Sequence, residues 1–257
     1  MARILDFEGI PNFRDFGGYD TACGRGLRAG RLYRSGHHHD ATEADIEKLA
    51  GLGIGVIVDL RRTAEREREP SRRWPGFDAV VIDNDLPDRD KPWEEVLRGN
   101  DPTPVFFRRI SREWYQRAPF EPRLIDLYTR YLGMLAETDG AILIHCAAGK
   151  DRTGLLAAIT HHLAGVHRND LVQDYLLTNE APSQTTHAPR VAKLIARHTG
   201  RSPSDEAVRV AMGVHAEDLE AAFAEIDARY GSLDSYVEQA LGLSGGTRAA
   251  IEARHLG

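Results

Sequence analysis

The residues with the clearest capacity for chemistry lie in the stretch AILIHCAAGKDRTG, residues 141–154, where Arg152 follows Cys146 by six positions. The thiolate of a cysteine is a strong nucleophile. A guanidinium offers planar, paired donors that match two oxygens of a phosphoryl group. This pairing favours attack by sulfur on the phosphorus atom of a phosphate ester that Arg152 binds.

The segments around Cys146 indicate how the two side chains are positioned. An apolar run, residues 141–144, precedes His145 and Cys146, and the apolar run LLAAITHHLAG ends at Gly165. The pattern predicts a strand, a tight loop and a helix. Backbone amides at the start of a helix converge on an anion, which the helix dipole also favours. We therefore expect a phosphate site made by the loop.

The same surroundings favour an ionised thiol. Helix termini and neighbouring cations lower the pKa of a cysteine to roughly 3.5–7.5, so we expect Cys146 to be a thiolate at neutral pH. The expected reaction is attack on phosphorus, a cysteinyl-phosphate intermediate and its hydrolysis by water. Because Arg152 and the amides supply the positive charge, the sequence predicts no metal and no cofactor. The expected phosphate-binding residues are Ala147, Ala148, Gly149, Lys150 and Thr153.

The loop HCAAGKDRTG resembles the signature of the cysteine-dependent protein tyrosine phosphatases, which is His-Cys, five residues, Arg, then Ser or Thr. The Lys-Asp pair before the arginine is similar to bacterial tyrosine and dual- or triple-specificity phosphatases of the Listeria and mycobacterial type, which also act on phosphoinositides. Further landmarks of that family, which extend the resemblance over most of the chain, are NFRDFGG (12–18), GRLYRSG (30–36), VDLR (58–61) and DYLLTN (174–179).

The resemblance implies a fold, substrates and a product. The fold is α/β, protein tyrosine phosphatase-like, with a mostly parallel central sheet flanked by helices and a helical C-terminal part. The implied substrates are phosphotyrosine and, more broadly, phosphoserine, phosphothreonine and phosphoinositides, with inorganic phosphate as product. Lys150 is either an exposed charge or, as the resemblance implies, a partner for additional phosphates.

The leaving oxygen of the substrate needs a proton, so we expect a carboxylic acid near the loop. Asp151 resembles the aspartate at the equivalent place of myotubularin-type loops, where it is the suggested acid. Asp59 is the second candidate for this catalytic role. The third is the acidic cluster Asp83, Asp85 and Asp88. His145 is expected to tune Cys146 rather than act as a base, since a preformed thiolate needs none.

Three other interpretations stay open at this point. The chain could be a phosphate- or phosphoinositide-binding module without turnover, or Cys146 could be a buried structural thiol. It could also be another enzyme with a cysteine loop, such as a sulfurtransferase or an arsenate reductase. Arsenate reduction ordinarily needs further resolving cysteines, and Cys23 is the only other cysteine in the sequence.

Composition narrows the class of protein. The 257 residues, 42% hydrophobic and 28% charged, suit an ordinary globular protein, and the formal charge of −6 gives no sign of nucleic-acid binding. Two cysteines exclude a disulfide framework and favour a reducing compartment.

Without a signal sequence or an apolar run near 18 residues, we expect a cytoplasmic protein with no stable membrane insertion, although export without a signal stays open. Nothing in the sequence indicates an oligomeric state.

Apolar runs predict the sheet that must hold the loop. Residues 53–60 and 77–83 are typical of buried strands, and the charged segment 61–70 between them is typical of a solvated helix. Strands separated by helices pair in parallel, and ligands then bind beyond the carboxyl ends of the strands.

The glycine-rich residues 1–36 predict a small hairpin, in which Arg14 and Asp15 form structural ion pairs or, as the resemblance suggests, lie near the site.

We expect one phosphatase domain over residues 1–257. Residues 91–122 carry aromatic and arginine side chains and are interpreted either as a lid or substrate wall or as a packed surface excursion. The run His37–His39 favours a loop over a metal site, since consecutive residues of regular structure cannot all face one ion. Helices are predicted over residues 42–50, 124–135, 169–177, 191–197, 216–230 and 232–241.

Overall fold

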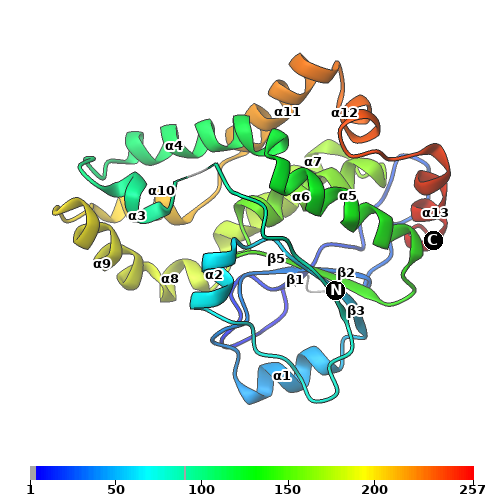
Figure 1. The fold of residues 1–257 in the computed structure, drawn as a ribbon, viewed down its shortest axis with the longest axis horizontal. Helices are drawn as coiled ribbons and strands as arrows, with labels where there is room; N and C mark the ends of the chain where they lie inside the picture. Colours follow the sequence, from blue (N-terminus) through cyan, green and yellow to red (C-terminus); the bar gives the residue numbers. More distant parts are fainter. Residues whose placement is uncertain (1–3, 90) are drawn as a thin grey trace.

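The computed structural model describes residues 4–89 and 91–257, which fold around a five-stranded sheet of order β1-β2-β5-β3-β4 (Figure 1). Strand β1 is antiparallel to β2, and the other pairs are parallel, which confirms the mostly parallel sheet. The strands are β1 (Arg14–Asp15), β2 (Leu32–Ser35), β3 (Ile54–Asp59), β4 (Val80–Ile82) and β5 (Ala141–His145).

Helices cover both faces of this sheet (Figure 1). They are α1 (Glu43–Ala50), α2 (Thr63–Arg68), α3 (Trp93–Leu97), α4 (Pro104–Arg117), α5 (Pro122–Glu137), α6 (Asp151–Leu163), α7 (Arg168–Leu176), α8 (Ser183–Thr186), α9 (Ala188–Thr199), α10 (Asp205–Met212), α11 (Ala216–Tyr230), α12 (Leu233–Gln239) and α13 (Gly245–His255), with 3-10 turns η1 (Ala118–Phe120) and η2 (Leu177–Glu180).

The central strand β5 divides the apolar core in two. Its residues Ile142 and Ile144 join a large cluster with α5 and α6, whereas Leu143 joins a smaller cluster with α1 on the other face. Successive strand side chains point to opposite faces, so a strand buried on both sides is largely apolar, as this one is over residues 141–144. The strand therefore delivers Cys146 from the middle of the molecule.

The segment 91–122 forms α3, α4 and η1 and packs with α9 and α10 at one end of the molecule (Figure 1). A third apolar cluster joins these helices and includes Phe106 and Phe107. Most of the aromatic rings in this segment are thus packing residues. One exception bears on the site, because Tyr115 of α4 is buried with its hydroxyl turned toward the residue before Arg152.

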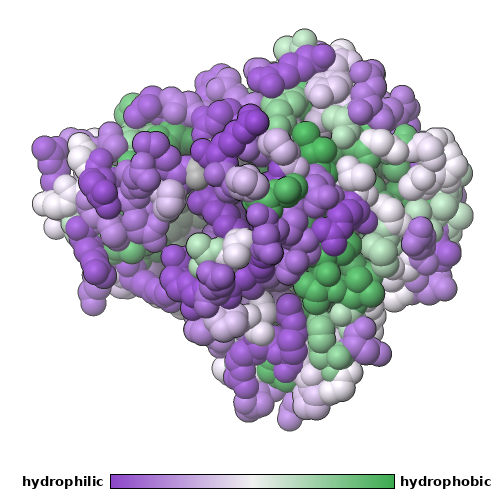
Figure 2. Space-filling view, viewed as in Figure 1, coloured by the Kyte–Doolittle hydropathy of each residue, from purple (hydrophilic) through white to green (hydrophobic). Residues whose placement is uncertain are grey.

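The outer surface is mostly hydrophilic on the side that Figure 2 shows. Among the described residues, the large apolar side chains that are exposed are Val80, Val81, Leu86 and Val105. None of the described helices has both the length and the apolar character needed to cross a membrane.

Candidate active site

Cys146 lies directly after β5 and is only 2% exposed, at the start of the loop that leads into α6. Two backbone contacts hold this loop against the end of β2: the amide of His37 donates to the carbonyl of Ala147, and Gly149 packs on Ser35. A Cβ on Gly149 would lie 2.4 Å from the Ser35 carbonyl carbon, and its φ is +70°. Only glycine fits this position, so the narrow loop predicted from the sequence has a steric cause.

Arg152 is held by a carboxylate that the sequence analysis assigned to a solvated helix. Its Nη1 and Nη2 donate to the two Glu65 oxygens at 2.6 and 2.8 Å, and Nη1 also donates to the carbonyl of Leu60 at 3.1 Å. Burial would raise the pKa of Glu65, but the charge and hydrogen bonds of Arg152 lower it to about 2. Glu65 is therefore ionised at neutral pH and orients Arg152.

This arrangement leaves one edge of the Arg152 guanidinium available. The contacts with Glu65 and Leu60 use both hydrogens of Nη1 and one of Nη2, and among the described residues none accepts from Nε. The remaining hydrogens, on Nε and Nη2, lie along the same edge and form a fork that suits two phosphate oxygens. Glu65 thus selects the face of Arg152 that meets a ligand.

We expect Glu65→Gln to lower kcat/KM about 10- to 100-fold, because an uncharged amide cannot hold both ends of the Arg152 fork. Steady-state kinetics on a phosphotyrosine peptide measure this effect. Glu67→Gln, on the exposed side of the same helix, is the matched control and should behave as wild type. Equal kinetics for the two variants would show that Glu65 does not orient Arg152.

Asp151 lies at the first position of α6, beside Arg152, with its side chain one-third exposed. The hydroxyl of Tyr115 donates to its Oδ1 at 3.2 Å, and Tyr175 in turn donates to Tyr115 at 2.7 Å. Lys150 Nζ lies 3.7 Å from Oδ2. A carboxyl group that is held at the loop and still reaches solvent can exchange a proton with a bound ligand.

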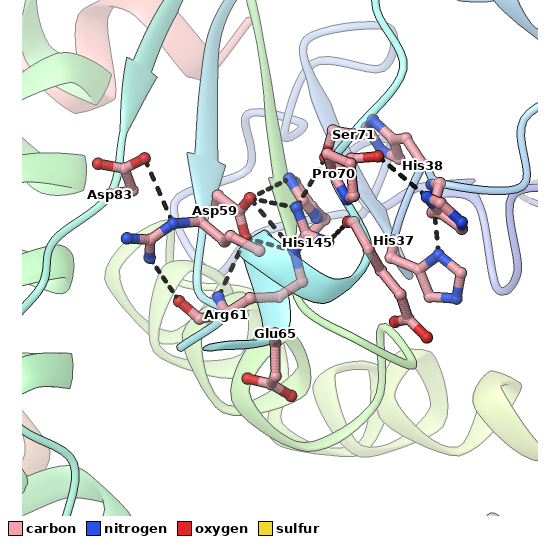
Figure 3. Close-up of polar contacts among 12 residues, drawn as sticks. His37, His38, Asp59, Arg61, Glu65, Pro70, Ser71, Asp83 and His145 are labelled. Carbon is pink, nitrogen blue, oxygen red and sulfur yellow. Dashed lines mark hydrogen bonds and ion pairs between the residues drawn. The ribbon is translucent and has the colours of Figure 1, made fainter. Parts of the chain in front are cut away.

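The geometry argues against Asp59, the second candidate for the acid. Figure 3 shows its carboxylate between Arg61 and His145. Arg61 donates to it from Nε and Nη2 at 2.9 and 2.7 Å, and the side chain is almost fully buried. Burial would raise the pKa of Asp59, but the hydrogen bonds and charge of Arg61, with the adjacent His145 ring, hold it well below its usual value. A buried carboxylate without a proton cannot act as an acid, so we assign Asp59 to holding Arg61.

The acidic cluster after β4 is likewise engaged with arginines of the α2 segment. Asp88 pairs with Arg62 at 2.6 Å, while Asp83 and Asp85 both pair with Arg66. These ion pairs hold α2 against the segment that follows β4, and α2 carries Glu65. The cluster therefore supports the orientation of Arg152 indirectly. Asp151 is the candidate that lies next to Arg152 with a side chain one-third exposed.

His145 is neutral at pH 7, since burial lowers its pKa to about 4 although the Asp59 charge opposes the shift. Its ring stacks on that of His38 with centroids 4.5 Å apart, and neither ring nitrogen forms a hydrogen bond with a described residue. Asp59 Oδ2 lies 3.5 Å from its Nε2. The ring thus packs below the loop. It forms no hydrogen bond through which it could tune Cys146, the role that the sequence analysis expected for it.

The remaining predicted ligand residues differ in how available they are. The Thr153 hydroxyl is buried with no hydrogen-bond partner among the described residues, so its donor is unused. Lys150, in contrast, donates from Nζ to the carbonyls of Ala211 at 2.8 Å and Gly213 at 3.2 Å. Lys150 is therefore bound to the end of α10.

Cys23 lies at the opposite end of α6 from Cys146. The neighbouring Ala22 donates from its amide to the carbonyl of Gly165, and Thr21 pairs with Val166. The 13 residues of α6 span about 20 Å, whereas a disulfide needs Cα atoms within about 7 Å. This separation removes the arsenate reductase interpretation, which needed Cys23 as a resolving thiol.

Within residues 4–89 and 91–257, no group of three or more His, Cys, Asp or Glu side chains could hold a metal ion. The run of histidines is split between different surroundings. His38 is buried against His145, while the ring of His39 hydrogen-bonds the carbonyl of Pro70.

Comparison with known proteins decides the family. Residues 5–257 match the model of the tyrosine phosphatase family, which is nearly the whole chain. The chain belongs to that family. This tyrosine phosphatase is 32% identical over 247 residues to a Cupriavidus necator protein whose name assigns it as a tyrosine-protein phosphatase, covering 92% of this chain and 84% of the relative.

Two further relatives agree with this membership. The phosphatase is 30% identical over 265 residues to the triple specificity protein phosphatase PtpB of Mycobacterium tuberculosis, covering 92% of this chain and 94% of the relative. It is 31% identical over 139 residues to a tyrosine-protein phosphatase of Nostoc commune, covering 53% and 44% of the two chains. The predictions of a phosphatase fold and of an enzyme that acts on phosphotyrosine are confirmed.

Proposed function

We propose that this tyrosine phosphatase hydrolyses phosphomonoesters through a cysteinyl-phosphate on Cys146. The observation that carries the proposal is the free Nε/Nη2 edge of Arg152, which Glu65 leaves beside the loop that begins at Cys146. The amides of residues 147–152 and this edge bind the three non-bridging oxygens. Electrostatic stabilisation of these oxygens strengthens as the transition state forms.

In the first step the sulfur of Cys146 attacks phosphorus, a P–S bond forms and the P–O bond to the leaving group breaks. Asp151 gives its proton to the departing oxygen, so the alcohol or phenol leaves neutral. In the second step the Asp151 carboxylate takes a proton from water, whose oxygen attacks phosphorus and displaces the sulfur. Inorganic phosphate leaves, Cys146 returns as the thiolate, and Thr153 can donate to that thiolate.

The test of this route is to trap the intermediate. We expect acid quenching during turnover of a phosphotyrosine peptide to give a Cys146-containing peptide that is heavier by one phosphoryl group. Glu65 and Asp151 variants that slow its hydrolysis should accumulate it. If phosphate is released while this peptide never carries the group, even in single-turnover experiments, water attacks the substrate directly and the proposed route is overturned.

We further propose that the substrate range extends to phosphoserine, phosphothreonine and phosphoinositides. The support is the triple specificity named for the M. tuberculosis relative and the Lys-Asp pair before Arg152.

We infer that residues 1–257 act as one phosphatase domain. Within it, the helices of 91–122 form a wall beside the loop, because Tyr115 contacts Asp151.

A Lys150 variant tests whether this residue binds phosphoinositides or only anchors α10. If a phosphoinositide draws Nζ away from the carbonyls of Ala211 and Gly213, we expect Lys150→Met to lower phosphoinositide turnover about tenfold and phosphotyrosine turnover less than about threefold. Parallel assays on vesicles and on peptides measure both. Lys193→Met, an exposed lysine of α9, is the control. Equal losses on both substrates would mean that Lys150 acts only by anchoring α10.

A further inference from the structure

Four polar side chains that the mechanism does not use meet behind the phosphate loop. They come from three separate segments, the start of β1, β2 and α7, and each is at most 7% exposed: Asn12, Arg14, Arg34 and Asp174. Burying so much charge in a protein core is costly unless the groups are paired and hydrogen-bonded. Their contacts therefore indicate what the arrangement stabilises.

Asp174 joins the two arginines. Its Oδ2 accepts from Arg34 Nη1 at 2.9 Å, and its Oδ1 lies 3.5 Å from Arg14 Nε. Arg14 also donates to the Asn12 side-chain oxygen and, at 2.8 Å, to the backbone carbonyl of Asp174. The four side chains thus form one connected network, which we call the rear network.

The rear network reaches the loop at two backbone carbonyls, that of Lys150, 3.5 Å from Arg34 Nη2, and, more closely, that of Gly149. The carbonyl oxygen of Gly149 accepts from Asn12 Nδ2 at 2.8 Å and from Arg34 Nη2 at 3.1 Å. In a trans peptide group the N–H points opposite to the C=O, and none of the peptide bonds in the described chain is cis. Two donors that fix this carbonyl therefore aim the amide of Lys150 in the opposite direction, away from the rear network.

Asn12 holds its position at a conformational cost. Its φ of +58° makes it the one non-glycine residue with a positive φ in the part of the chain that the structure describes. Asparagine tolerates this region better than most residues, but such conformations persist only where the surroundings enforce them, and they are concentrated at functional sites. Here the enforcing contacts are those to Arg14 and Gly149.

The rear network also carries unbalanced charge. Burial opposes ionisation of Asp174, but Arg14 and Arg34 lower its pKa to about 2, so it is negative at neutral pH. Burial, with the neighbouring Arg34, lowers the pKa of Arg14 to about 10, which still leaves it positive. Two guanidinium groups and one carboxylate give a net positive charge in a buried place where solvent screens little.

We propose that Asn12 and Arg34 are positioning residues of this phosphatase: they fix the Gly149–Lys150 peptide so that its amide faces the substrate phosphate, and the rear network adds positive potential behind the phosphate loop. The inference rests on the proposed function in that phosphate is the ligand of the loop. It also accounts for the separate segments 12–18, 30–36 and 174–179, because each contributes to the rear network.

One assay that needs no turnover tests both parts. Iodoacetamide is neutral, so its rate of reaction with Cys146 follows the ionised fraction of the thiol, and inorganic phosphate protects the thiol by occupying the loop. Asn12→Gly keeps the positive φ without strain and removes the donor to Gly149, together with the side-chain oxygen that accepts from Arg14. We expect it to need about tenfold more phosphate for half protection, because one hydrogen bond that orients the loop is lost.

Substitutions of Arg34 separate geometry from charge. Arg34→Lys keeps the charge but cannot donate to both Asp174 and Gly149, so phosphate protection should weaken while alkylation without phosphate stays near wild type. Arg34→Gln should also slow alkylation without phosphate. Asn100→Gly, at an exposed turn, controls for the substitution. Leu163→Ala, buried near the far end of α6, controls for lost stability.

The outcomes are distinct. Folded Asn12→Gly and Arg34→Lys proteins with wild-type phosphate protection would overturn the proposal, even if their melting temperatures fall. If the Arg34 variants do not fold, Asn12→Gly decides alone. A wild-type protein that phosphate does not protect, and that releases no phosphate from phosphotyrosine, would instead overturn the proposed function.

Discussion

Cys146→Ser will abolish measurable turnover, with a loss of roughly 10⁴-fold or more in kcat on a phosphotyrosine peptide. A serine hydroxyl is not ionised at neutral pH, and the adjacent His145 is not placed to act as its base, because its ring packs against His38 with neither ring nitrogen hydrogen-bonded. Release of inorganic phosphate measures the effect. The variant should still bind substrate, since the Arg152 edge and the loop amides are unchanged.

The matched control is Cys23→Ser, which changes the exposed cysteine at the other end of α6 and should keep wild-type activity. Binding of a phosphotyrosine peptide to Cys146→Ser, measured by calorimetry, separates lost chemistry from lost folding. Residual activity above one-tenth of wild type in a correctly folded Cys146→Ser protein would contradict a cysteine nucleophile.

Asp151→Asn will lower kcat about 100- to 1,000-fold on a substrate with a poor leaving group, the typical range for loss of a general acid. The loss should be much smaller with p-nitrophenyl phosphate, whose phenoxide leaves readily without a proton. Asparagine keeps the size of the side chain and an oxygen that can accept from the Tyr115 hydroxyl. The ratio of kcat on phenyl phosphate and p-nitrophenyl phosphate measures this dependence on the leaving group.

Asp59→Asn provides the comparison, because it tests the competing candidate with the same substitution. It leaves the buried Arg61 without a charged partner. We therefore expect the free energy of unfolding to fall by roughly 3–5 kcal/mol, which lowers the melting temperature. Its ratio for the two leaving groups should equal that of wild type. If Asp59→Asn shifts this ratio and Asp151→Asn does not, the assignment of the acid is reversed.

Local patterns predicted the elements that hold Cys146. The apolar run before Cys146 and the helix after it correspond to β5 and α6, and the Thr42 cap with Asp45 forms the capping box that begins α1. These features depend on neighbouring residues alone, which a sequence displays directly. The sequence analysis did not predict helices α10 and α13, because α10 is stabilised by packing on α4 and α13 by packing on α5. In addition, α13 begins with two glycines, which weaken the helical pattern.

The residues that orient the site were harder to find. Glu65 lies in a charged segment whose solvated appearance concealed that one position faces Arg152, 87 residues away in the chain. The useful signal was its place in the first turn of the helix that follows β3, close to the strand's carboxyl end, where parallel strands gather ligand-binding groups. The link between Arg34 and Asp174 spans 140 residues and leaves no local pattern.

The position of Cys23 at the far end of α6 has a consequence for oxidative damage. Peroxide converts a reactive thiolate to a sulfenic acid, which further peroxide takes to irreversible sulfinic and sulfonic acids unless a thiol or a backbone nitrogen captures it first. With no second cysteine of this chain within reach of Cys146, an internal disulfide cannot provide that protection. We therefore expect that a backbone nitrogen or small thiols from the surroundings capture an oxidised Cys146.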